Sequence, residues 1–373
     1  MRAPILAVCG VLAPFVFACG GPAVGRVEAP AEAPAATPTT TTPPPPATPS
    51  AGDYAVPGEA PCTPVDNIKF VCGMVSPEDI AVLPGGAWAI ASGNREGGRL
   101  HLVDVKSKTA TVVFPAPGQR EQLDAGRYPT CPGPLDLQKP DLFKAHGLYL
   151  KPGANGRHTL LVVHHGTRES IEVFDVDASG TPPSLTWVGC APALSTQTFN
   201  SVVALPEGGL AATNTRAGDV WEYHKESGWR RVPGTEKTAP NGLEISKDGR
   251  WLYIAGWAEE KVTRVSRGRA PVQRDMIALG FRPDNIRFSA DWSVLFAAGH
   301  TDKDGRSIVE PREPLKETIN VSRIDPTTLE HRRIFEHKAI AGFVAATTAV
   351  PIGDELWLGS NRGDRVAYFP APK

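Results

Sequence analysis

Beyond residue 76, short apolar runs alternate with clusters of Gly, Pro, Asn and Asp, and long segments with a helical period are lacking. Residues 239–257 are typical of this pattern. Leu243 and Ile245 alternate with polar neighbours, residues 247–249 contain an Asp-Gly turn, and residues 251–255 form a second apolar run. Apolar and polar residues alternate before the turn, and an apolar run follows it. This pattern predicts a β-hairpin. The domain is therefore expected to be all-β.

The same hairpin recurs along the chain, each time behind one or two polar residues that we call the heading of the repeat. Most copies are followed by a second hairpin-like pair, so each repeat holds four short strands, and the repeats are spaced by roughly 40 to 65 residues. The six repeats begin at Pro77, Ala145, Phe199, Pro240, Pro283 and Ala346.

Six repeats of four short strands predict a six-bladed β-propeller with four-stranded blades. A pair of β-sandwiches is the rival fold, but it would not produce a polar heading at the start of every unit. The last repeat ends in "DRVAYFPAPK", which leaves too few strands for a full blade. We therefore expect the first unit to be completed by chain from both ends.

The N-terminus has the pattern of an export signal. Arg2 precedes an apolar stretch at residues 5–17, which is too short to span a membrane as a mature helix. We predict a signal peptide over residues 1–18. The run "VFACGG" resembles the bacterial lipoprotein signal, in which a Cys after a small residue carries the lipid. Cys19 is thus a candidate lipidation site, and an ordinary secretory signal is the alternative.

Residues 19–60 are rich in Pro and Thr and contain almost no apolar bulk, which predicts an extended tether ahead of a propeller over residues 61–373. The chain is expected in the cell envelope or periplasm, touching a membrane only through a lipidated N-terminus. Its formal net charge of −1 provides no basic surface for nucleic acid. We expect a monomer.

Four cysteines lie in the predicted mature domain or at its start: Cys62, Cys72, Cys131 and Cys190. In an exported chain this number suggests two disulfides, for which three connectivities exist. We predict Cys62 with Cys72 and Cys131 with Cys190. Free buried cysteines are the alternative, and zinc-type spacing is absent from the sequence.

The headings bring candidate metal ligands to one place, because the innermost strand of each propeller blade runs along the central channel. Single Asn and Asp residues before a strand are often only turn formers. Five headings in one register instead indicate converging ligands, and carboxylate and amide oxygens suit calcium. The polar residues are Glu78, Asp79, His146, Asn200, Asn241, Asp284 and Asn285.

These stretches resemble two known groups of proteins. "PNGLEISKDGRWLYIAG" is similar to a motif of the senescence-marker/gluconolactonase family and of the paraoxonase-type arylesterases. "PEDIAVL", "AHGLYL", "LLVVHHGTRESIEVFDV", "FNSVVALPEGGLAATN" and "RPDNIRF" resemble paraoxonase segments. The resemblance covers most of residues 77–369. It implies a calcium-dependent six-bladed propeller that hydrolyses lactones or aryl esters.

The resemblance also implies a ligand set. It assigns one calcium ion in the channel, and a second ion to Asp79, the Leu148 carbonyl and an aspartate after the third heading. Ser201 stands at that last position, and a lost carboxylate weakens a calcium site, so the second ion is left open. The family's disulfide between the chain ends has no counterpart. The residues implied for the first ion are Glu78, Asn200, Asn241, Asp284 and Asn285.

Two histidines complete the implied site. His146 heads its strand and titrates near neutrality, which suits a general base. His165 matches the second histidine of the family's proposed dyad, whereas His164 points to the opposite face of the strand. The alternative is that these histidines only pack within their strands. His300, at the end of a strand, is a candidate substrate-lining residue.

The predicted function is therefore a calcium-dependent hydrolase of lactones or aryl esters. In this predicted mechanism the calcium ion polarises the carbonyl group of the substrate, and His146 acts as general base with help from His165. There are two alternatives. One is a non-catalytic, surface-tethered binding module that keeps the calcium for stability, since a fold does not decide function. The other is a sugar-lactone hydrolase closer to the gluconolactonases, which rely on the metal without the paraoxonase histidines.

Overall fold

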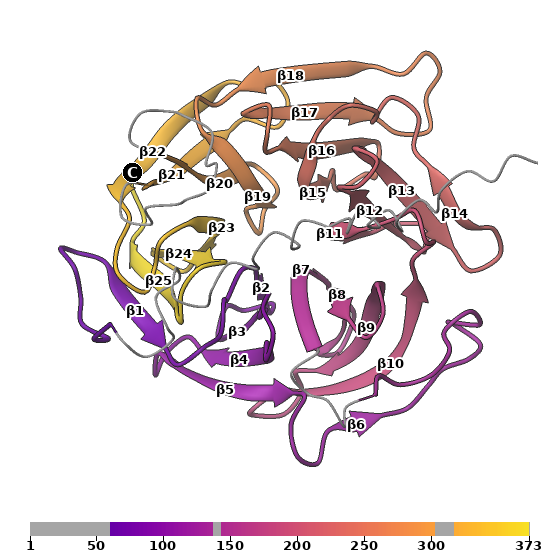
Figure 1. Cartoon of the computed structure of the whole chain (residues 1–373), viewed down its shortest axis with the longest axis horizontal. Coiled ribbons are helices and arrows are strands. Elements are labelled where there is room, and N and C mark those ends of the chain that lie inside the picture. Colours follow the sequence, from indigo (N-terminus) through magenta and orange to yellow (C-terminus); the bar gives the residue numbers. More distant parts are fainter. Residues whose placement is uncertain (1–59, 137–142, 303–316, 373) are drawn as a thin grey trace, which may run out of the picture. The chain divides into compact units, whose positions relative to one another are not determined.

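Six β-sheets surround a central axis in the computed structural model, which describes residues 60–136, 143–302 and 317–372. The predicted signal peptide, Cys19 and nearly all of the predicted tether lie outside the described residues. Within the described part no helix is present, and therefore none is long and apolar enough to cross a membrane. The sheets form the six-bladed β-propeller that the repeats predict (Figure 1).

Five blades are continuous in sequence, and we number all six in chain order. The first blade consists of β2 (Ile80–Val82), β3 (Trp88–Ala91), β4 (Leu100–Asp104) and β5 (Thr109–Phe114). The second consists of β7 (Phe143–Lys151), β8 (Arg157–Gly166), β9 (Ser170–Asp177) and β10 (Ser184–Pro192), with the short β6 (Arg120–Glu121) added in parallel to β10.

The next three blades repeat this order. The third contains β11 (Phe199–Ala204), β12 (Leu210–Asn214), β13 (Asp219–His224) and β14 (Gly228–Arg231). The fourth contains β15 (Pro240–Ile245), β16 (Trp251–Gly256), β17 (Lys261–Ser266) and β18 (Arg274–Ala278). The fifth contains β19 (Arg282–Phe288), β20 (Leu295–Asp302), β21 (Glu317–Ile324) and β22 (His331–Lys338).

The closing blade differs from the expectation. The first repeat forms a complete blade by itself, and it is the last repeat that draws on both chain ends. The sixth blade contains β23 (Ala346–Ile352), β24 (Glu355–Ser360), β25 (Arg365–Pro370) and, as its outer strand, β1 (Lys69–Cys72), which pairs antiparallel with β25. Because β1 precedes the first heading, the repeat pattern could not assign it to a blade.

Both predicted disulfides are confirmed. Cys62 is bonded to Cys72 at the end of β1, and Cys131 is bonded to Cys190 in β10. Both bonds therefore hold segments outside the regular repeats against the edges of blades. Disulfides of this kind are consistent with an exported protein, because they persist in oxidising compartments.

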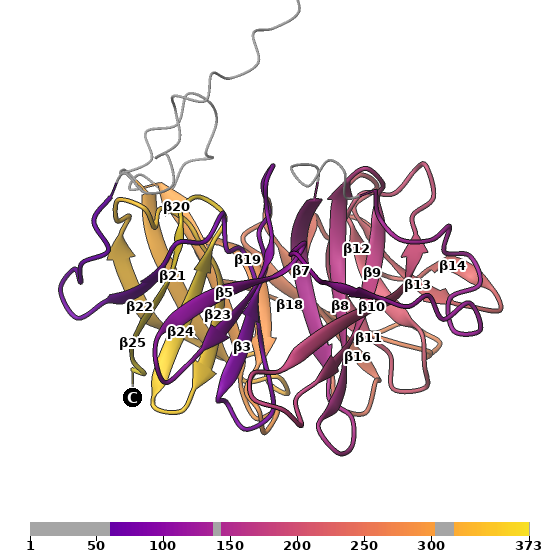
Figure 2. The ribbon, with the colours of Figure 1, turned by 90° about the horizontal axis from the view of Figure 1, so that it is seen from below.

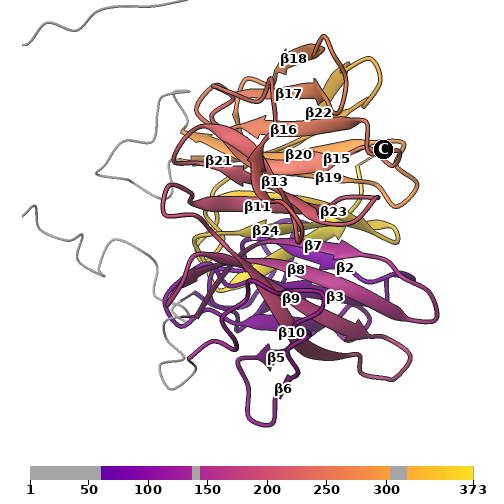
Figure 3. The same ribbon diagram turned by 90° about the vertical axis from the view of Figure 1, so that its right-hand side faces the viewer.

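The hydrophobic core lies between the blades. Between the first two blades, for example, Phe114 packs edge-on against Phe143 and Phe174, with ring centroids 5.2 and 4.8 Å apart, and Trp187 is buried beside them. The strands run across the thickness of the ring of blades (Figures 2 and 3). Apolar contacts thus hold the blades face to face, while β2, β7, β11, β15, β19 and β23 surround the axis.

Candidate metal and catalytic site

Each heading lies where an innermost strand begins, and in five blades the strand has a β-bulge at that point. A bulge inserts residues that leave the ladder and redirects their side chains. The pattern of strand, turn and strand in the sequence does not reveal these bulges. The register shifts fall between Ala145 and Leu148, Phe199 and Val202, Pro240 and Leu243, Pro283 and Ile286, and Ala346 and Ala349.

Two glycines in these bulges allow neighbouring headings to approach closely. A Cβ atom at Gly242 would lie 2.5 Å from the carbonyl oxygen of Asp284, and one at Gly147 would lie 2.4 Å from that of Asn200. Such contacts are shorter than any side chain tolerates, so glycine is required. Gly242 therefore brings the fourth heading against the fifth, and Gly147 brings the second against the third.

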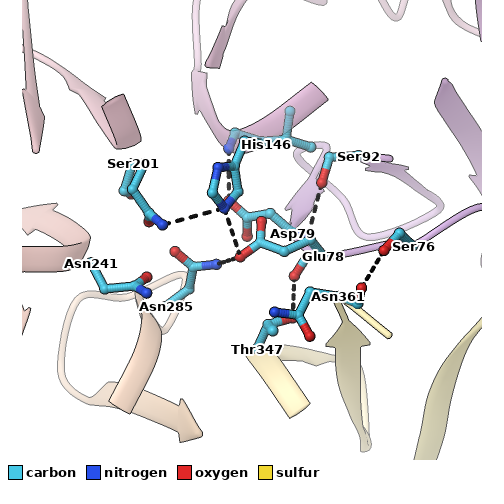
Figure 4. Close-up of polar contacts among 12 residues, drawn as sticks. Ser76, Glu78, Asp79, Ser92, His146, Ser201, Asn241, Asn285, Thr347 and Asn361 are labelled. Atoms are coloured by element: carbon cyan, nitrogen blue, oxygen red, sulfur yellow. Dashed lines mark hydrogen bonds and ion pairs between the residues drawn. The ribbon is translucent and has the colours of Figure 1, made fainter. Parts of the chain in front are cut away.

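The side chains of the headings converge from different blades (Figure 4). The Asn285 amide donates to Glu78 Oε1 at 2.6 Å, which joins the fifth blade to the first. Among the described residues, four buried atoms of the predicted ligand set have no hydrogen-bond partner: Glu78 Oε2, Asn200 Oδ1, Asn241 Oδ1 and Asn285 Oδ1.

Four orphaned oxygens in one place fit a hard cation. A buried polar atom without a partner is costly, and native structures leave few of them. Calcium takes six to eight carboxylate, amide, carbonyl and water oxygens in flexible geometry. The donor set is therefore suited to calcium, with Asp284 as a second buried carboxylate beside Asn241.

The electrostatics of the cluster also favour a cation. Burial raises the pKa of Glu78 well above its ordinary value, and the charges of Asp79 and Asp284 add to this effect. Burial, with the charge of Asp79 second, raises the pKa of Asp284 to about 8. Carboxylates that resist ionisation in each other's presence are stabilised by a positive charge placed between them.

The predicted histidine pair is formed. His146 Nδ1 lies 2.9 Å from His165 Nε2, and His165 Nδ1 lies 2.7 Å from Glu169 Oε2. His146 Nε2 lies 3.3 Å from the Asn200 amide nitrogen and 3.7 Å from Glu78 Oε1. A row of hydrogen bonds thus leads from Glu169 through both imidazole rings to Asn200, one of the candidate metal ligands.

This network assigns the tautomers of both rings. Glu169 accepts a hydrogen bond from His165, so the hydrogen of His165 is on Nδ1. The Nε2 of His165 is then an acceptor, and His146 donates the hydrogen on its own Nδ1 to it. The lone pair of His146 is then on Nε2, which faces Glu78 and Asn200. Burial, and next the neighbouring imidazole of His165, lower the pKa of His146 well below its ordinary value, so the ring is neutral.

His164 has the separate role expected from strand alternation. Its ring packs 5.2 Å from that of Phe143, its Nδ1 donates to the Arg168 carbonyl at 2.9 Å, and burial lowers its pKa to about 4. The structure therefore brings His165, and not its neighbour, to His146.

Two further residues of the site, Glu169 and Thr347, are not indicated by the repeat pattern. Glu169 lies across the tight turn between β8 and β9 from His165, and its other oxygen accepts the Phe199 amide at 2.7 Å. Its position four residues after His165, just past a turn, was the available signal. Thr347 in the sixth heading donates to the Glu78 carbonyl oxygen. Polar β-branched residues at a strand start give no such signal.

His300 lies at the same mouth of the channel as the headings. It is buried opposite Arg282 in the β19–β20 ladder, its Nδ1 is 3.5 Å from the Ala346 carbonyl oxygen, and its ring lies 6.0 Å from that of Trp257. None of these contacts involves a predicted metal ligand. Its assignment to the substrate stays a prediction.

A cavity of about 650 Å³ lies at the other ends of the innermost strands. It is lined by residues of β2, β7, β15, β19 and β23 and by several of the turns that follow them, and Arg287 and Glu244 are its charged residues. The cavity and the headings are therefore at opposite ends of the channel, and the cavity does not provide the predicted catalytic pocket.

The residues implied for a second ion, Asp79 and Leu148, lie together but already have a partner. Asp79 Oδ2 accepts the Leu148 amide at 2.7 Å, and the Arg287 guanidinium donates to Asp79 Oδ2 and to the Leu148 carbonyl oxygen. Ser201, fully buried, has an Oγ without a hydrogen-bond partner in the described part of the chain.

Comparison with known proteins places the fold. No protein-family model matches the chain, and no curated protein matches it in sequence. Among solved structures it is similar to a luciferin-regenerating enzyme, with 13% identity, a TM-score of 0.51, and coverage of 82% of this chain and 95% of the other. It is also similar to a gluconolactonase from Xanthomonas campestris, with 15% identity, a TM-score of 0.51, and coverage of 82% and 89%. At these identities the likeness is one of fold.

Proposed function

We propose that this protein is a calcium-dependent hydrolase of lactones or aryl esters, with its site at the propeller headings. The observation that carries the proposal is the pairing of two features in one place. Four buried side-chain oxygens lack partners, and a neutral histidine directs the lone pair of its Nε2 at the same group. A metal kept only for stability needs no base beside it. The similarity in fold to a gluconolactonase is compatible with a lactone substrate for this chain.

The bound ion would be held by Glu78, Asn200, Asn241, Asp284 and Asn285. When bound, it supplies a Lewis acid that polarises the substrate carbonyl and stabilises the oxyanion charge of the transition state. The chain itself supplies the proton transfers. No other residue in the described part of the heading cluster offers a neutral nitrogen base.

His146 Nε2 accepts a proton from the water that adds to the carbonyl carbon, and the ring becomes an imidazolium. The positive charge is stabilised through His165 by Glu169, because each Nδ1 hydrogen already points along the row toward that carboxylate. His146 then returns the proton to the leaving oxygen as the C–O bond breaks. An aryl ester gives a carboxylic acid and a phenol, and a lactone gives a single hydroxycarboxylic acid.

Hydrolysis in the presence and absence of chelator tests the proposal. Purified protein is assayed with phenyl acetate and with a panel of γ- and δ-lactones, first with calcium and then with EGTA. We expect turnover that EGTA abolishes and added calcium restores. The absence of chelator-sensitive turnover on every substrate would contradict the proposal and favour a binding module.

Calcium is also expected to raise the melting temperature. An ion bound only by the folded state stabilises it by mass action, by about 2.7 kcal/mol at a concentration of 100 Kd. Differential scanning fluorimetry in calcium and in EGTA measures the shift. Magnesium is the control, because it demands a smaller and more rigid octahedral site. Equal melting temperatures in calcium and EGTA would remove the metal from the proposal.

A further inference from the structure

Arg287 is a buried cation at the centre of the propeller. It lies on β19, three residues after Asp284, and only 7% of its surface is exposed. Its Nη2 donates to Asp79 Oδ2 and, at 3.0 Å, to the Leu148 carbonyl oxygen. Its Nη1 lies 3.8 Å from Glu244 Oε1. One side chain therefore connects the fifth blade to the first, second and fourth.

Its acceptors are two of the three ligands that the family resemblance implies for a second calcium ion. A carboxylate and a main-chain carbonyl suit either a metal ion or a guanidinium, because both groups bind positive charge. The third implied ligand is Ser201, which has lost the carboxylate. The residues present therefore do not fit the second ion, because the oxygens of Asp79 and Leu148 that would bind it already accept hydrogen bonds from Arg287.

We propose that Arg287 replaces the second calcium ion, so that a cation belonging to the chain fastens the inner strands together. This role goes beyond the proposed hydrolase and does not depend on it. A guanidinium remains charged at all ordinary pH values and cannot be removed by a chelator. Arg287 also positions Asp79, the residue that follows Glu78 in the first heading.

The exchange explains why Ser201 is tolerated. Ser201 adjoins this site, because its Cα would lie 2.8 Å from a Cβ atom at Gly147, the residue before Leu148. If the third ligand lies where the resemblance implies, an aspartate there would add a third carboxylate to Asp79 and, across the guanidinium, Glu244. A divalent ion balances such a set, whereas Arg287 supplies a single positive charge. The serine at position 201 and the guanidinium of Arg287 are thus two parts of one charge balance.

Calcium stoichiometry is the first test. The unaltered chain is stripped with EGTA, titrated with calcium in a calorimeter, and analysed for retained metal after desalting. We expect no more than one ion per chain. A second ion bound to the unaltered chain would overturn the assignment. A count of zero would sink the proposed hydrolase but leave Arg287 as the resident cation, so the two failures are distinguishable.

A paired exchange tests the equivalence directly. In Arg287→Ser with Ser201→Asp, the cation is removed and the missing carboxylate is restored. This variant is expected to bind one calcium ion more than the unaltered chain, and to gain more in melting temperature when calcium is added. A folded variant with the same calcium count as the unaltered chain would overturn the proposal.

Removal of the charge alone gives the third readout. Arg287→Met is expected to lower the melting temperature by roughly 10 °C, because it leaves Asp79 buried and uncompensated. The drop should be of similar size in EGTA and in calcium. Arg127→Met is the matched control, since Arg127 makes an exposed pair with Asp124 and Asp175. Equal melting temperatures for Arg287→Met and the control would overturn the proposal, and the stoichiometry test needs no variant to fold.

Discussion

Replacement of His146 by Gln is expected to lower kcat for lactone and aryl ester hydrolysis about 10²- to 10⁴-fold, which is the usual contribution of a positioned general base. Gln retains a hydrogen-bonding end group but has no lone pair of comparable basicity. The affinity for calcium should change little, because His146 is not one of the proposed calcium ligands. Its Nε2 lies 3.7 Å from Glu78 Oε1. Steady-state kinetics and calcium titration measure the two effects separately.

His164→Gln is the matched control for this experiment. His164 is the same residue type on the same strand as His165, but it packs against Phe143 away from the headings. Its replacement should affect stability more than kcat. Glu169→Gln should lower kcat by less than His146→Gln, because Glu169 acts only through His165. An unchanged kcat in His146→Gln would mean that the base lies elsewhere.

The sequence was sufficient to predict the blades because the propeller repeats one local structure. Each hairpin contains its own turn and its own alternation, and so it can be recognised without knowledge of its neighbours. The closing blade was predicted wrongly for the same reason. β1 precedes the first heading and pairs with β25, almost 300 residues away, and no local pattern encodes such a pairing.

The candidate site was predictable as a set of headings but not as a geometry. The repeat register showed that Glu78, Asn200 and Asn241 occupy equivalent positions. It did not show the bulges that redirect these side chains, or the amide orientations that leave their oxygens without hydrogen-bond partners. Arg287 illustrates the limit. It stands in the quoted motif "RPDNIRF", yet its partner Asp79 is 208 residues distant.

Glu78→Gln is expected to weaken calcium binding by at least about 100-fold, because the loss of even an outer partner of a metal ligand costs about 10- to 100-fold. The substitution preserves size and removes one charge from the donor set. A calcium titration by calorimetry measures the affinity. The melting temperature of the variant should therefore rise much less on calcium addition than that of the unaltered protein.

In EGTA the order of stability should be reversed. The pKa of Glu78 is raised in the folded protein, so its ionisation opposes folding when no cation is present. The stability of the calcium-free protein should fall as the pH rises above the ordinary carboxyl range, because the folded state holds the proton that the unfolded chain releases. Glu78→Gln removes this cost, and its melting temperature in EGTA at pH 8 should exceed that of the unaltered chain. The gain should shrink as the pH falls toward 4.

This crossing of stabilities separates a metal ligand from a structural residue. If Glu78 serves only to accept the Asn285 amide, its replacement should lower the melting temperature equally in EGTA and in calcium. A ligand instead stabilises the fold with the ion and destabilises it without the ion, because a buried carboxylate needs a cation to offset its charge. A variant that is less stable than the unaltered chain in both buffers would thus reduce the first heading to a packing feature.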